Sequence, residues 1–188
     1  MCAVPYRECS LRYVSWRIVT YRLGREQSRH RVGVWRELRR LGAVALQSAT
    51  WAIPIGDRFD EGLAKAVSLV ERGDGQILVF DVAPSDASST VLEQLYTAER
   101  EAEWTEFCSE CDKALVELRG EFAKEKFTLA ELDEEEQNLD RLRRWYRELR
   151  AKDIFGAPSS SPAELQLKGC AELLEEFAER VYEARERP

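Results

Sequence analysis

The chain has 188 residues, 44% of them apolar, with five Trp, six Tyr and seven Phe; this composition supports a folded core and excludes wholesale disorder. Its apolar runs are much shorter than the about 20 residues of a membrane span, and its first residues lack the pattern of a signal peptide, so we expect a cytoplasmic protein without a membrane partner. The net charge is −7, but residues 1–84 hold 13 Lys and Arg against 9 Asp and Glu (+4), whereas residues 85–188 carry −11. This asymmetry indicates a polyanionic partner for the basic part.

The basic part begins with a strand and a helix. Residues 13–23 are rich in β-branched and aromatic side chains, which predicts a strand. Ser28 is expected to cap a helix that ends at Gly42, because a glycine there can adopt the left-handed conformation that follows many helices. The apolar stripe of this helix is read from its spacing as Val32, Trp35, Leu38 and Leu41.

A hairpin, a second helix and a last strand follow. Residues 43–47 and 50–55 are short extended runs that predict a hairpin. Asp57 is a candidate cap for a helix that reaches Gly73, and residues 76–82 form a nearly continuous apolar run that is typical of a central strand. The order β-α-β-β-α-β predicts a ferredoxin-like module over residues 1–84, within an α+β chain.

The acidic part predicts three long helices. Ser88 or Ser89 can cap the first, which reaches about Lys126. Thr128 and Glu131 have the spacing of a capping box, and Phe127 with Leu132 that of a hydrophobic staple, so a second helix begins there and ends near residues 154–158. The third begins at residues 161–164, with Pro162 at its first position. We expect residues 85–188 to form an antiparallel helical hairpin with a third packed helix.

The residues that could support catalysis are few. His30 is the only histidine and lies between two arginines, and the chain has no G-x-G-x-x-G, P-loop or H-E-x-x-H motif. The five cysteines are scattered and odd in number, which argues against a disulfide framework. Cys108 and Cys111 are weak candidates for a metal or redox site, but they fall on an apolar helical stripe where core packing is the better interpretation. We therefore predict a protein that is not an enzyme and has no cofactor.

The arginines of the first module are the most informative feature. Guanidinium groups bind phosphate and other oxyanions through paired donors, and here they alternate with aromatic residues. Three interpretations stay open: nucleic acid, a small oxyanion such as chromate or sulfate, or pairing with the acidic helices of the same chain. The candidate binding residues are Arg17, Arg22, Arg25, Arg29, His30, Arg31, Arg36, Arg39 and Arg40.

Several strings of the sequence carry a family resemblance. They run in order through most of the chain: Trp16–Leu23, Ser28–Val32, Trp35-Arg36, Leu41-Gly42-Ala43, Leu46-Gln47, Trp51, Glu131-Leu132, Arg141–Trp145, Asp153–Ala157 and Phe177–Tyr182. With this order and spacing the chain resembles the N-terminal domain of the ChrB chromate-resistance regulators, in a standalone version. The resemblance implies a DNA-binding transcriptional regulator of chromate-resistance genes.

The first module also resembles the ferredoxin-like domain of the phenylacetate-degradation repressors and of the small CRISPR adaptation nucleases. Those nucleases carry an Asp at the end of the first strand, where this chain has Val19-Thr20-Tyr21-Arg22, so nuclease activity is not expected.

Our leading hypothesis is a homodimer that binds double-stranded DNA, with phosphate contacts from Arg29, Arg31, Arg36 and Arg39. One alternative is a signalling or scaffold protein that docks a partner or a separate sensor protein through its helices. The other is an oxyanion-binding or redox protein that uses Cys108 and Cys111.

Overall fold

The computed structural model describes residues 15–186 as a mixed α/β protein with a four-stranded antiparallel sheet and five helices. Cys2, Cys9 and the first two residues of the predicted first strand lie outside this range. The chain divides into two compact units, Met1–Leu92 and Glu93–Pro188. The elements are β1 (Trp16–Arg22), α1 (Ser28–Leu41), β2 (Val44–Gln47), β3 (Thr50–Pro54), α2 (Asp57–Arg72), β4 (Gln76–Val82), α3 (Asp86–Ala123), α4 (Leu129–Lys152) and α5 (Ser160–Glu186).

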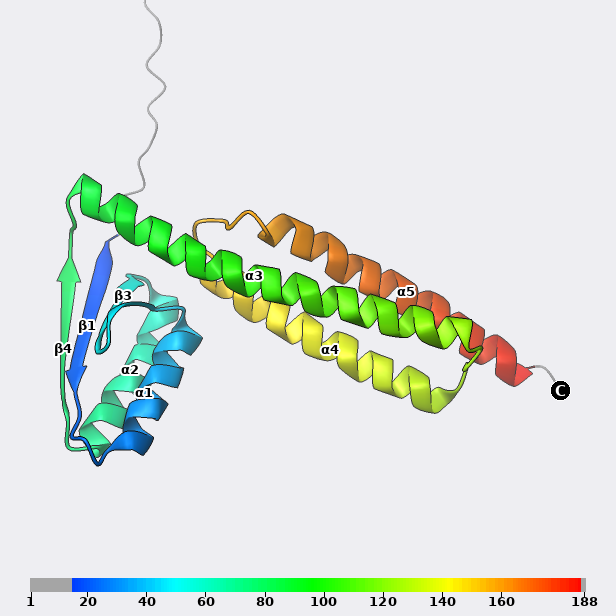
Figure 1. Ribbon diagram of the computed structural model, residues 1–188, viewed down its shortest axis with the longest axis horizontal. Coiled ribbons are helices and arrows are strands. Elements are labelled where there is room, and N and C mark those ends of the chain that lie inside the picture. The colour runs from blue at the N-terminus through cyan, green and yellow to red at the C-terminus, as the bar shows by residue number, and fades with distance from the viewer. Residues whose placement is uncertain (1–14, 187–188) are drawn as a thin grey trace, which may run out of the picture. The chain divides into compact units, whose positions relative to one another are not determined.

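The sheet has the strand order β2-β3-β1-β4, and β1 pairs in antiparallel fashion with both β3 and β4. Helices α1 and α2 lie on the same side of this sheet (Figure 1). The centre of the sheet presents Val19, Trp51 and Ile53 as buried side chains. The helices contribute further buried apolar residues, namely Val34, Leu38, Leu41, Phe59, Leu63, Ala66 and Val70. Burial of these residues fixes α1 with one face against the core and the other toward solvent.

The central position predicted for residues 76–82 is wrong, because β4 is an edge strand and the two inner strands are β3 and β1. Leu78 and Phe80 are 57% and 50% exposed, so the apolar run of β4 is not covered on both faces. An apolar run shows that a strand is compatible with burial, but the pairing order depends on contacts that are distant in sequence.

The apolar stripe predicted for the first helix is also partly wrong. Its buried residues are Val34, Leu38 and Leu41, whereas Val32 and Trp35 are 46% and 48% exposed. The predicted stripe advanced by three residues at each step, and an α-helix of 3.6 residues per turn rotates such a series away from one face. Two large apolar side chains therefore lie on the solvent side of α1.

Four of the predicted helix starts are shifted, those of α1, α2, α3 and α5. Helices α1 and α2 begin at Ser28 and Asp57 themselves, after Gln27 and Gly56, and neither preceding residue caps through a side chain. Helix α3 begins at Asp86, ahead of the predicted serines, and the Ser85 Oγ accepts from the Ser88 N–H at 3.4 Å.

Pro162 is the third residue of α5 instead of the first, and α4 ends at Lys152, slightly before the predicted stop. Two predicted helix caps are confirmed, Gly42 at the C-terminus of α1 and Thr128 at the N-terminus of α4. Gly42 has φ 86°, and the Thr128 side chain accepts from the Glu131 N–H.

The second unit is built on the apolar faces of α3, α4 and α5. Its buried side chains include Trp104, Phe107, Cys111, Leu118, Leu132, Leu139, Leu142, Leu149, Cys170, Leu174, Phe177 and Val181. Asp153, after the end of α4, is buried and accepts from the Trp104 indole N–H at 2.9 Å. It also accepts from the N–H groups of Gly156 at 2.9 Å and Ala157 at 3.0 Å, so one carboxylate holds the loop between α4 and α5 against α3. Within residues 15–186, no helix has an apolar stretch long enough to cross a membrane.

Candidate nucleic-acid interface

The solvent side of α1 is a surface of arginines. Because Val34, Leu38 and Leu41 point inward, the side chains between them point outward on a helix that turns about 100° per residue. The first turn holds no acidic residue and the last turn holds Arg39 and Arg40. We name the exposed residues Arg29, Arg31, Val32, Trp35, Arg36, Arg39 and Arg40 the arginine face.

Three of the predicted arginines lie outside the arginine face: Arg17 and Arg22 on β1, and Arg25 in the turn before α1. Arg17 lies on β1, with a side chain only 16% exposed, and its guanidinium binds Asp81 through Nε at 2.6 Å and Asp60 through Nη1 at 2.6 Å. The hydrogen bond from Arg17 lowers the pKa of Asp81. Arg22, at the other end of β1, donates to the Gln76 side chain at 3.3 Å. Neither residue belongs to the arginine face.

Among residues 15–186, Glu37 and Glu61 are carboxylates that interact with Arg40 of the arginine face. Arg40 pairs with Glu37, one turn earlier, at 2.9 Å. Arg31 donates to the Gly24 carbonyl at 2.8 Å, a contact that orders the side chain but, with a neutral acceptor, does not neutralise its charge. Among residues 15–186, no carboxylate lies within ion-pair distance of Arg29 or Arg36. The face therefore keeps a positive charge that a polyanion can neutralise.

A shallow cleft of about 600 Å³ lies between α1 and α2, at the edge of the arginine face. Gly33 of α1 lies beside Leu69 of α2, where a Cβ would make an ordinary contact of 3.5 Å with that side chain. The cleft is lined by Ser28, Arg29, His30, Val32, Gly33, Arg36, Leu69 and Arg72.

Three guanidinium groups and the imidazole meet at this cleft. The His30 Nδ1 lies 3.1 Å from the Gln27 Oε1, which orients the ring, and Arg72 donates to the Ser68 carbonyl at 3.2 Å. Arg72 was missed from the sequence because it comes from α2, 36 residues or more after the other cleft arginines. Its only sequence signal is its place in the last turn of that helix.

Cys108 and Cys111, the candidates for a metal or redox site, contact different residues of the second unit. Cys111 is buried in the core of the second unit, where the Cys170 thiol donates to the Cys111 carbonyl at 3.5 Å. Cys108 is half-buried, with its Sγ 4.0 Å from the Ser159 carbonyl, and burial raises the pKa of its thiol. In the part of the chain that the structure describes, no three His, Cys, Asp or Glu side chains are arranged to hold a metal ion.

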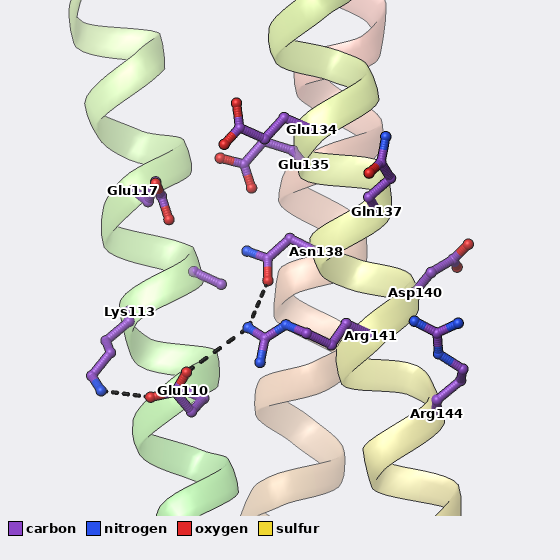
Figure 2. A pocket seen from close by; sticks show the side chains of 11 residues that line it. Glu110, Lys113, Glu117, Glu134, Glu135, Gln137, Asn138, Asp140, Arg141 and Arg144 are labelled. Atoms are coloured by element: carbon purple, nitrogen blue, oxygen red, sulfur yellow. Dashed lines mark hydrogen bonds and ion pairs between the residues drawn. The ribbon is translucent and has the colours of Figure 1, made fainter.

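A groove of about 760 Å³ lies between α3 and α4 in the second unit. Figure 2 shows Glu134 and Glu135 of α4 directed toward Glu117 of α3. Glu135 is only 8% exposed, and burial together with Glu117 and Glu134 raises its pKa. At the far end of the groove, Arg141 donates to Asn138 at 2.9 Å and lies 3.8 Å from Glu110. This mixed, mostly acidic groove lacks the positive field of the arginine face.

Comparison with known proteins gives one family. The family model described as "Protein ChrB, N-terminal" matches residues 31–188, which include most of α1 and all elements after it. No match to a curated protein was found.

Proposed function

The chain belongs to the ChrB N-terminal family, and we propose that it is a transcriptional regulator of chromate-resistance genes that binds double-stranded DNA without catalysis. The observation that carries this proposal is the arginine face of α1. It places Arg29, Arg31, Arg36 and Arg39 on one exposed helix surface, and among residues 15–186 no carboxylate lies within ion-pair distance of Arg29 or Arg36. Phosphate contacts of this kind supply most of the affinity for DNA, whatever its sequence.

The proposed architecture is a ferredoxin-like first unit followed by a helical unit. The strand order β2-β3-β1-β4, with two helices on one side, supports that description. We further propose that the protein acts in the cytoplasm as a homodimer, since two copies of the arginine face would double the phosphate contacts and match a two-fold symmetric site.

The test is binding of a labelled duplex of about 30 base pairs from the promoter of the chromate-resistance genes. Fluorescence anisotropy at 50 and 200 mM salt should give an affinity that falls steeply as salt rises, by roughly ten- to a thousandfold for a few phosphate contacts. Absence of binding at low ionic strength would refute the proposal. A duplex of unrelated sequence shows how much of the affinity is sequence-independent.

A second function is favoured by the cleft between α1 and α2. Arg29, Arg36 and Arg72 surround a space that suits a tetrahedral oxyanion, and Arg binds such groups through its fork of donors. Titration calorimetry with chromate and with sulfate tests this function directly. Heat of binding that is lost in the Arg72→Ala variant would support an oxyanion-binding protein; the absence of heat with either ion would dismiss it.

A further inference from the structure

Trp35 is an exposed aromatic residue in the middle of a cationic surface. It is 48% exposed, whereas Trp16, Trp51 and Trp104 are buried. Val32, one turn before it, is 46% exposed. The core beneath α1 is completed by Val34, Leu38 and Leu41, so neither Val32 nor Trp35 is needed to hold the helix on the sheet. Exposed large apolar groups that have no packing role indicate a contact surface.

The arginine face consists of three parallel rows. Val32, Trp35 and Arg39 are spaced by three and four residues and form the middle row. Arg29, Arg36 and Arg40 form one flank, and Arg31 lies on the other flank, one turn before Trp35. Apolar atoms therefore lie along the centre, with guanidinium groups on both sides.

This arrangement matches the cross-section of a DNA major groove. The 14 residues of α1 make a rod about 21 Å long, and a major groove about 12 Å wide admits one α-helix between two rows of phosphates. We propose that α1 enters the major groove, with Val32 and Trp35 against thymine methyl groups and the flanking arginines against the phosphates. This inference rests on the proposed binding of double-stranded DNA and identifies α1 as the element that contacts the bases.

The charge around Trp35 favours DNA over a protein partner. Its neighbours on the face are Arg31, Arg39 and Arg36, and the one acidic residue of α1, Glu37, pairs with Arg40. A partner must bring many negative charges together with apolar groups at the centre of the contact. Major-groove DNA has both, since each A·T pair presents the C5-methyl group of thymine on the groove floor.

The experiment selects duplexes from a pool with a randomised centre of about 16 base pairs and measures the affinity of the selected sequences. Wild-type protein should enrich sequences with thymines at fixed positions. Replacing those thymines by uracil removes only the methyl groups and should weaken binding by about fourfold for each contacted methyl. The Trp35→Ala variant should bind DNA with the same salt dependence, lose the thymine preference and the uracil response at the positions that Trp35 contacts, and keep them at the positions that Val32 contacts.

The matched control is Tyr182→Ala, which removes an exposed aromatic side chain from α5 and should behave as wild type. Circular dichroism checks that both variants fold. A wild-type protein that binds thymine and uracil duplexes equally, or a Trp35→Ala variant that selects the same sequences, would overturn the inference and leave the proposed function standing. A wild-type protein that binds no duplex at any salt concentration would overturn both.

Discussion

The guanidinium of Arg39 lies over the indole ring of Trp35, with its central carbon 5.7 Å from the ring centroid. The two residues are four apart on α1, so the contact forms within one helix and needs no other element. A cation–π contact at an exposed site contributes roughly 0.5–1 kcal/mol. Its larger consequence is orientation, because it favours the conformation in which both side chains lie on the outer surface of the helix before a ligand arrives.

The exposure of Trp35 predicts that it contributes little to folding. The Trp35→Ala variant should lower the free energy of unfolding by about 1 kcal/mol or less, mainly through loss of the cation–π contact with Arg39. Leu38→Ala, which removes a fully buried side chain from the same helix, should cost about 2–5 kcal/mol. Urea unfolding followed by circular dichroism measures both. Comparable losses in the two variants would place Trp35 in the core and contradict our description of α1.

Asp153 is expected to be essential for the helical unit. Asp153→Ala leaves the buried Trp104 N–H and two backbone N–H groups without their acceptor, at a cost of about 2–4 kcal/mol. Asp140→Ala, which removes an exposed carboxylate of α4, is the control and should cost less than about 1 kcal/mol. Thermal unfolding at neutral pH compares them, and an Asp153 variant as stable as the control would show that the loop has another anchor.

The buried Glu135 in the groove between α3 and α4 predicts that wild type and a Glu135→Gln variant differ in stability, and that the difference depends on pH. The pKa of Glu135 is raised in the folded state, so its charged form costs stability once the pH exceeds the ordinary value of 4.5. Glu135→Gln removes that charge and should stabilise the protein at pH 7 by on the order of 1 kcal/mol, or about 2–4 °C in Tm. As the pH falls below 4.5, wild-type Glu135 is protonated as well and the gain should disappear.

The control for this charge is Glu136→Gln, at an exposed position outside the groove. It should leave Tm nearly unchanged across the same pH range. A gain in the Glu135→Gln variant that persists at pH 4 would mean that the charge of Glu135 is not its cause.

Most of the element order could be predicted from the sequence, because the period of the apolar residues differs between strands and helices. Local chemistry also predicted Gly42 at the end of α1 and Thr128 at the start of α4. The edge position of β4 could not be predicted, because an apolar run carries no information about which strand lies beside it.

The candidate site was predicted in composition but not in arrangement. The sequence identified the arginines as the informative residues, yet only the structure shows that Arg17 is occupied by Asp60 and Asp81 from α2 and β4. The place of Arg72 at the cleft also depends on a contact between segments distant in sequence, because α2 packs beside α1. Contacts between residues distant in sequence decide which charges are neutralised, and the local pattern of one segment does not contain them.

The central claim is that the arginine face of α1 binds DNA phosphates, and the most direct measurement is the salt dependence of duplex binding by an Arg29→Ala, Arg36→Ala double variant. Each phosphate contact contributes about 0.9 to the slope of log affinity against log salt, so the double variant should show a slope smaller by about 1.8 and weaker binding at every salt concentration. The control is Arg143→Ala with Arg180→Ala, which removes two exposed arginines from α4 and α5 and should keep the wild-type slope. An unchanged slope in the Arg29 and Arg36 variant, or an equal loss in the control, would contradict the account.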